Sequence, residues 1–148
     1  MIDLDIQGMG SAGEGVGRLA DGRVVFVPQA LPGDRVRIEL AATRKQVQYG
    51  ELVELLVPSP DRVESRCRVE PCGGCALKKL SLAAQAQLKR QRVVDTMRRL
   101  GGLDLEARVG APLQAGDGWR YRHRVRLHAA WLEAAWRLGY FARRSHRL

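Results

Sequence analysis

The sequence predicts a mostly β protein with one main helix, in which a small barrel precedes an α+β region. Short runs of alternating apolar and polar residues, separated by glycine and proline turns, fill the first sixty positions. Apolar residues then recur at helical spacing over residues 81–100. After that helix the chain returns to alternating segments, which we interpret as further strands.

The first sixty residues contain about five short strands. Alternation or β-branched runs mark "IDLDIQGM", "RVVFVP", "LPGDRVRIEL" and "RKQVQYGELVELLVP". The glycine-rich stretch "GSAGEGVGRLADG", residues 10–22, is unsuited to a helix and is interpreted as turn and bulge. It resembles a phosphate-binding loop, but neither a helix pattern nor Gly-Lys-Ser/Thr follows it. Strands this short and closely spaced are typical of a small closed or partly closed barrel.

Residues 1–60 also resemble a TRAM domain. The resemblance rests on Gly15-Val16-Gly17, Phe26-Val27-Pro28 and residues 31–36, "LPGDRV", which occur in the order of that family. It implies an OB-like, five-stranded barrel that binds RNA through basic and aromatic groups. The local candidates for RNA contact are Arg44, Lys45 and Tyr49. The alternative is that these three are solvated turn residues.

The charge of the chain is strongly uneven. Residues 1–60 hold six Lys/Arg against eight Asp/Glu, whereas residues 61–148 hold nineteen against eight, and the overall net charge is +9. A basic half favours a phosphate-rich partner such as nucleic acid, although an arginine-rich composition alone would also produce it. With no signal peptide or long apolar run, we expect a cytoplasmic protein with no membrane partner, and a monomer.

All three cysteines, Cys67, Cys72 and Cys75, lie in "RCRVEPCGGCALKK" with C-x4-C-x2-C spacing. In a reducing compartment, clustered cysteines indicate metal ligands or reactive thiols before disulfides. An iron–sulfur cluster fits the Cys-Gly-Gly-Cys pair, whose glycines let backbone amides turn toward the sulfurs. Zinc stays open, because a histidine could be a fourth ligand. The histidines are His123, His128 and His146.

Following a TRAM-like segment, this loop resembles the cluster motif of the uridine-5 methyltransferases that act on large-subunit ribosomal RNA. "YRHRVRLH" and "LGYFARRSHRL" are similar to the central domain of that family. The resemblance implies a 4Fe-4S cluster held by Cys67, Cys72 and Cys75, with a fourth, distant cysteine that is absent from this sequence. It also implies S-adenosylmethionine as the methyl donor, a catalytic cysteine in a further domain, and ribosomal RNA as the partner.

Residues 81–100 form the expected helix. Ser81 caps its start and Gly101-Gly102 end it. The resemblance implies that this helix packs against a catalytic domain outside these residues, which leaves its apolar face partly bare. We therefore divide the chain into a TRAM domain at 1–60, a cysteine loop at 61–80, the helix at 81–102 and a partial central domain at 103–148.

The segment "WRYRHRVRLH", residues 119–128, is interpreted as a strand with four arginines on one face. Such a face attracts a phosphate backbone, and the alternative is a solvated face with scattered acidic partners. "RLGYFARRSHRL" is interpreted as a second basic strand that offers aromatic stacking surfaces. The RNA-contact candidates here are Arg120, Arg122, Arg124, Arg126, Phe141, Arg143 and Arg144.

The sequence therefore predicts an RNA-binding portion of a ribosomal RNA uridine-C5 methyltransferase. It contains no βαβ pattern for S-adenosylmethionine and no residue with a catalytic role, so we expect RNA binding without methyl transfer. The alternative is a stand-alone TRAM-type RNA-binding module with a zinc or metal-free cysteine loop.

Overall fold

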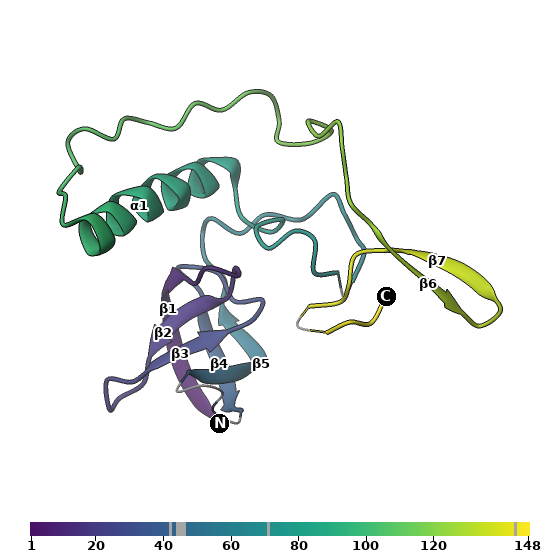
Figure 1. The fold of residues 1–148 in the computed structure, drawn as a ribbon. Coiled ribbons are helices and arrows are strands. Elements are labelled where there is room, and N and C mark those ends of the chain that lie inside the picture. The colour runs from purple at the N-terminus through teal and green to yellow at the C-terminus, as the bar shows by residue number, and fades with distance from the viewer. Residues whose placement is uncertain (42, 44–46, 71, 144) are drawn as a thin grey trace.

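A computed structural model describes the chain except residues 42, 44–46, 71 and 144. Figure 1 shows a barrel at one end, a helix beside it, and a long irregular segment that leads to a separate hairpin. The elements are β1 (Ile2–Met9), β2 (Gly15–Arg18), β3 (Val24–Val27), β4 (Arg35–Leu40), β5 (Gln48–Val57), α1 (Leu82–Gly101), β6 (His128–Leu132) and β7 (Ala135–Gly139). The predicted mostly β fold with one main helix is confirmed.

The first five strands form a closed barrel in the order β1-β2-β3-β5-β4, with β4 pairing back onto β1. All pairs are antiparallel except β3 and β5, which run parallel through Val25↔Gln48 and Phe26↔Tyr49. This is the five-stranded, OB-like arrangement that the sequence predicts. The glycine-rich stretch forms turns and β2 rather than a helix, also as predicted.

The barrel interior is filled by alternating residues of its strands. On β3, Val25 and Val27 are fully buried while Phe26 between them lies on the outer side and is partly exposed. Gly17 sits where a Cβ would approach Leu4 Cδ2 to 2.6 Å. A side chain at that position would therefore overlap the core. The core comprises Leu4, Ile6, Leu19, Val25, Val27, Ala30, Val36 and Ile38.

A buried ion pair joins the barrel to the segment that follows it. The Asp34 side chain is fully buried and accepts hydrogen bonds from Arg62 Nε at 2.8 Å and Nη2 at 2.7 Å. Beyond Arg62 the chain pairs with the end of the cysteine loop, because Val63 N donates to Lys79 O at 3.0 Å. The cysteine loop is therefore anchored to the barrel through Arg62.

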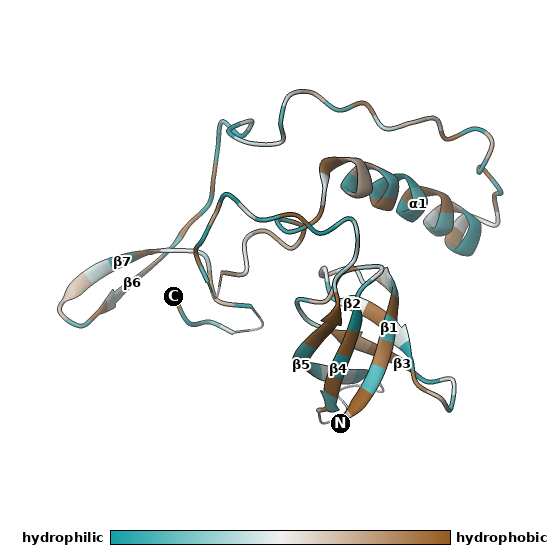
Figure 2. Cartoon of the chain, turned by 180° about the vertical axis from the view of Figure 1, so that it is seen from behind, coloured by the Kyte–Doolittle hydropathy of each residue, from teal (hydrophilic) through white to brown (hydrophobic). Residues whose placement is uncertain are grey.

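Helix α1 begins and ends as predicted. The Ser81 Oγ accepts from Ala84 N at 3.2 Å, and Gly102 closes the helix in the left-handed conformation with φ of 64°. Only Val94 is buried on α1, whereas Val93, Met97 and Leu100 are exposed. Hydrophilic and hydrophobic residues alternate along it in Figure 2. Within the described residues, no helix is long and apolar enough to cross a membrane.

The predicted strand over residues 119–128 is wrong. Residues 119–127 are irregular, and Arg120 has a positive φ of 54° that interrupts an extended run. A strand also needs a partner to satisfy its backbone groups, and in the described part of the chain none pairs with this segment. The hairpin β6–β7 starts only at His128.

The second predicted basic strand, over "RLGYFARRSHRL", is correct only for its first three residues, which end β7. From Tyr140 onward the chain leaves the hairpin and turns back toward the cysteine loop, where Phe141 O accepts from Gly73 N at 3.0 Å. A strand does not continue, because Ser145 N donates to Ala142 O at 3.1 Å and so closes a turn.

Candidate RNA-binding surface and cysteine loop

The arginines at 120, 122, 124 and 126 are all exposed. Among the described residues, none of them forms an ion pair with a carboxylate. Glu133, the nearest acidic residue on the C-terminal side, pairs with Arg137 at 3.2 Å instead. The four guanidinium groups therefore carry charge that no carboxylate of the described residues neutralises, which suits a phosphate backbone. The scattered acidic partners of the solvated-face alternative are not seen at these arginines among the described residues, and contact with RNA stays a prediction.

Arg122 has one local contact, with the neighbouring tyrosine. Its Nε donates to Tyr121 Oη at 3.3 Å, and its guanidinium carbon lies 5.7 Å from the centroid of that ring. This hydrogen bond raises the pKa of Arg122 above its usual value. The contact with Tyr121 orients the guanidinium of Arg122 locally.

The arginine segment starts beside the cysteine loop. Arg66, next to Cys67, binds Asp117 at 2.7 Å and places its guanidinium 5.8 Å from the Trp119 ring centroid. The carboxylate of Asp117 also accepts from Trp119 N at 3.0 Å. These contacts lower the pKa of Asp117, the Arg66 hydrogen bond having the largest effect. Residues 117–119 are thereby positioned against residue 66.

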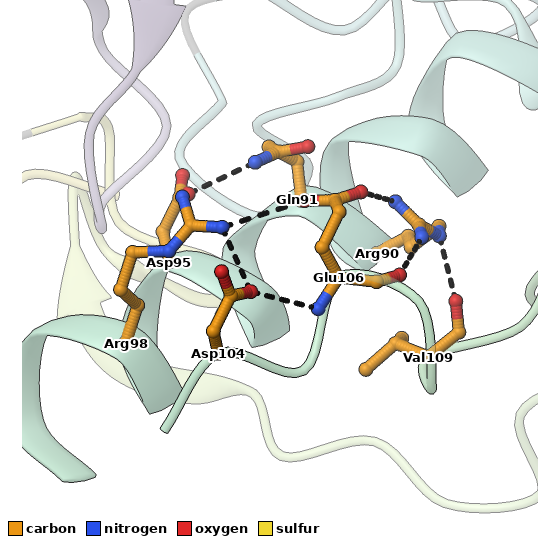
Figure 3. Close-up of polar contacts among 7 residues, drawn as sticks. All are labelled: Arg90, Gln91, Asp95, Arg98, Asp104, Glu106 and Val109. Carbon is orange, nitrogen blue, oxygen red and sulfur yellow. Dashed lines mark hydrogen bonds and ion pairs between the residues drawn. The ribbon is translucent and has the colours of Figure 1, made fainter. Parts of the chain in front are cut away.

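The basic residues of α1 have a different use. Arg90 donates to Val109 O at 2.9 Å and to the side chain and backbone of Glu106, both at 2.7 Å (Figure 3). Arg98 binds Asp104 at 3.1 Å, and this raises the pKa of Arg98 while the pKa of Asp104 is lowered. The two arginines hold the returning chain, residues 104–109, against the helix. They are structural contacts and not free charges for RNA.

The cysteine loop is packed between the barrel and the C-terminal tail. On the barrel side, Gly13 lies so close to Ala76 that a Cβ on the glycine would overlap it. On the other side, Gly73 N donates to Phe141 O at 3.0 Å, and a Cβ on Gly73 would come within 2.6 Å of that oxygen. Arg143 Nη2 donates to Cys75 O at 3.1 Å. Because Gly73 and Gly74 have no side chains, the C-terminal tail can pack closely against the loop. The same absence lets the loop backbone turn toward the sulfurs.

The three cysteines are free thiols; Cys67 and Cys72 are partly exposed and Cys75 is exposed. The Gly74 amide donates to Cys72 Sγ at 3.3 Å, and amide-to-sulfur hydrogen bonds of this kind surround cysteines that ligate clusters. However, the described residues contain no group of three or more Cys, His, Asp or Glu side chains placed to hold one metal ion. The donor chemistry therefore fits a thiolate-bound metal, while the side chains are not gathered around a common point.

The predicted stacking residue Phe141 is already in contact with two histidines. Its ring stacks on His128 with centroids 3.8 Å apart, and His146 meets it edge-on at 5.4 Å. Arg143 is engaged with the cysteine loop, as described above. The predicted contacts Arg44, Lys45 and Arg144 lie outside the described residues.

On the barrel, the predicted contact Tyr49 pairs with Phe26, at a centroid distance of 5.9 Å and an interplanar angle of 44°. Phe26 was not among the predicted RNA contacts. The alternation in "VVFV" was the available signal, since it places Phe26 on the outer face of a strand whose Val25 and Val27 point inward. Tyr49 and Phe26 come together only because β3 and β5 pair in parallel.

Comparison with known proteins finds a TRAM domain and relatives that are named as RNA methyltransferases. Residues 1–53 match the family model for the TRAM domain. The chain is 36% identical over 147 residues to an uncharacterised RNA methyltransferase of Clostridium tetani, covering 99% of the chain and 31% of that protein. It is 37% identical over 148 residues to another from Thermosynechococcus vestitus, covering 99% of the chain and 32% of that protein.

A third relative has a named substrate. Over 123 residues the chain is 41% identical to the 23S rRNA (uracil(1939)-C(5))-methyltransferase RlmD of Nitrosococcus oceani, which covers 82% of the chain and 27% of that protein. The chain spans about a third of the length of the curated relatives that it matches. The resemblance stated from the sequence is confirmed by these matches.

Proposed function

Residues 1–53 form a TRAM domain in a chain related to RNA methyltransferases, and on this basis we propose that the chain is the RNA-binding portion of a large-subunit ribosomal RNA uridine-C5 methyltransferase. The observation that carries the proposal is the run of exposed arginines at residues 120–126, without carboxylate partners in the described part of the chain, in a chain that also contains a TRAM barrel. Uncompensated guanidinium groups supply the salt-dependent affinity that RNA binding requires.

The second part of the proposal is that these residues bind RNA without methylating it. A dinucleotide-type cofactor fold needs parallel strands joined through helices. Here the one parallel pair among the described strands, β3 and β5, is connected through β4. S-adenosylmethionine and the nucleophile that adds to C6 of uracil therefore belong, in this proposal, to the longer enzyme.

We also propose that Cys67, Cys72 and Cys75 are ligands of a 4Fe-4S cluster in the longer enzyme, with the fourth ligand outside these residues. The amide of Gly74 at the Cys72 sulfur and the packing of the loop against both barrel and tail support a stable ligand loop. If bound, such a cluster would cross-link Cys67, Cys72 and Cys75 through its iron–sulfur bonds. Iron, sulfide and zinc analysis after anaerobic purification distinguishes a cluster from zinc.

The second candidate is a stand-alone TRAM-type RNA-binding module with a zinc or metal-free cysteine loop. The cysteine placement supports the metal-free form of this candidate, since the described residues gather no three metal-ligating side chains. In that case RNA binding is unchanged by chelators and the purified protein contains neither iron nor sulfide.

Fluorescence anisotropy with a labelled 23S rRNA fragment, together with transfer of a labelled methyl group from S-adenosylmethionine, tests the proposal. We expect binding that weakens steeply with salt and no methyl incorporation. Methyl transfer by this chain alone would contradict the non-catalytic assignment, and absence of RNA binding at low salt would contradict the proposal as a whole.

A further inference from the structure

The outer side of the barrel carries a hollow of about 240 Å³ between β3 and the start of β5. It is lined by Arg23, Val24, Phe26, Thr43, Val47 and Gln48. Typical sites for drug-sized ligands measure roughly 300–1,000 Å³, so this hollow suits a single flat ring better than a whole cofactor. Only Phe26 offers an aromatic surface among its lining residues.

The position of the Phe26 ring is fixed by its neighbours. Gly10 lies against its edge, since a Cβ on Gly10 would come within 2.9 Å of Phe26 Cε1. On the neighbouring strand, Tyr49 packs at a centroid distance of 5.9 Å. A ring held in this way loses little freedom when a second ring stacks on it, which is a condition for efficient base stacking.

The polar wall of the hollow is also fixed. Gln48 donates from Nε2 to Ala41 O at 2.7 Å and to Tyr49 O at 3.0 Å. Its Oε1 accepts from Thr43 Oγ1 at 3.0 Å. Because the amide of Gln48 is fully engaged, it shapes the wall and does not read the edge of a base. Recognition here is therefore by stacking, which tolerates any base.

Arg23 supplies positive charge at the rim. Its Nε binds Asp21 Oδ2 at 2.7 Å, and its backbone N–H donates to Asp21 Oδ1 at 3.0 Å. These contacts orient the side chain, while its Nη atoms have no carboxylate partner among the described residues. A guanidinium oriented through Nε leaves two nitrogens for a phosphate.

We propose that this hollow binds one unpaired nucleotide of single-stranded RNA, with the base stacked on Phe26 and the adjoining phosphate at Arg23. The inference rests on the proposed RNA-binding function and adds a second contact, on the barrel, to the arginine segment of residues 120–126. It requires an unstacked base, so it applies to single strands and not to duplexes.

The test compares fluorescein-labelled oligouridine with a duplex of equal length, using the whole chain. Phe26→Leu keeps an apolar side chain and removes the π surface, and we expect about tenfold weaker binding of the single strand with duplex binding unchanged. Phe26→Tyr keeps the ring and is expected to bind like the original chain. Arg23→Gln, on the exposed rim, is expected to lower the salt slope for the single strand by about 0.7.

The outcomes separate the two proposals. If Phe26→Leu and Arg23→Gln both bind the single strand as the original chain does, the hollow is not a nucleotide site, although RNA binding stands. Equal losses for single strand and duplex also overturn it, because a stacking site does not act on paired bases. If circular dichroism shows that Phe26→Leu does not fold, the salt slope measured for Arg23→Gln tests the nucleotide site instead. If the original chain binds neither RNA, the proposed function itself is wrong.

Discussion

Asp34 and Arg62 form a buried ion pair, Oδ2 to Nη2 at 2.7 Å, that joins the barrel to the segment carrying the cysteines. The same carboxylate accepts from Leu31 N at 2.6 Å and Ser59 N at 2.9 Å, and Arg62 Nη2 also donates to Gln29 O at 3.0 Å. Every oxygen of the buried carboxylate is therefore hydrogen-bonded. The pair closes the barrel at the turn before β4 and sets the direction in which the chain leaves β5.

Replacing Arg62 by Gln is expected to lower the free energy of unfolding by about 3 kcal/mol, because it leaves the buried Asp34 carboxylate without its cation. Urea denaturation followed by circular dichroism measures the change. Arg37→Gln is the matched control, since Arg37 pairs with Asp3 and Glu54 on the exposed side of the same sheet. A loss for Arg62→Gln no larger than that of Arg37→Gln, about 1 kcal/mol or less, would contradict this role.

Because of the Asp34 carboxylate, we also expect the protein to lose stability at acid pH. Burial raises the pKa of Asp34, but the hydrogen bonds from Arg62, Ser59 and Leu31 outweigh it, so the pKa lies below the ordinary value of 3.8. Its stabilising contribution is consequently complete above the unfolded-state pKa and is lost as the pH falls below about 3.8 toward the folded value. Unfolding free energies measured from pH 6 to pH 2 should fall more steeply for the original chain than for Asp34→Asn. Parallel curves would contradict the prediction.

The turn of the hairpin β6–β7 is built from Glu133 and Ala134, which both have positive φ, at 51° and 59°. Two-residue turns of this type favour Asn-Gly, so the double change Glu133→Asn and Ala134→Gly is expected to stabilise the hairpin by about 1 kcal/mol. The near-ultraviolet circular dichroism of Trp131 and Trp136, which meet edge-on at 5.5 Å, reports hairpin formation. As the control, Ala129→Gly inside β6 should weaken the same signal. A weaker signal in the double variant would count against the assigned turn.

The packing of the tail on the cysteine loop depends on Gly73. Gly73→Ala would place a Cβ 2.6 Å from the backbone oxygen of Phe141, so the tail must move away and its hydrogen bond is lost. We expect amide exchange over residues 140–148 to accelerate about fivefold, the effect of roughly 1 kcal/mol. Gly110→Ala, where a Cβ meets nothing within 4 Å, is the control. Equal exchange in both variants would show that the tail does not dock there.

Sequence patterns located the barrel and the helix because both have local signals. Strands such as β1 and β4 alternate in the register that the barrel uses, and Ser81 and Gly102 mark the ends of α1. The ion pair Asp34–Arg62 has no local signal, since its members are 28 positions apart. Its existence depends on how the chain leaves the closed barrel.

The two failures on the C-terminal side have a common cause. Alternation over residues 119–128 looked like a strand, yet a strand forms only where a neighbour pairs with it. The hairpin that does form was missed because Glu133-Ala134 lacks the glycine or asparagine of a typical turn. For the candidate site, the four arginines were selected through a strand pattern that the structure does not contain; they are exposed, and their contact with RNA stays a prediction. Phe26 needed the parallel pairing of β3 and β5 to bring it to Tyr49.

The most direct test of RNA binding through the arginine segment is the salt dependence of affinity for a single-stranded rRNA fragment. The original chain is compared with a variant carrying Gln at positions 120, 122, 124 and 126, and with Arg90→Gln as the control, since the Nε, Nη1 and Nη2 atoms of Arg90 all donate within the chain. Each phosphate contact contributes about 0.7 to the slope of log K against log salt concentration. We predict that the four-residue variant loses about 3 from the slope and the control loses none, and an unchanged slope in the four-residue variant would contradict the account.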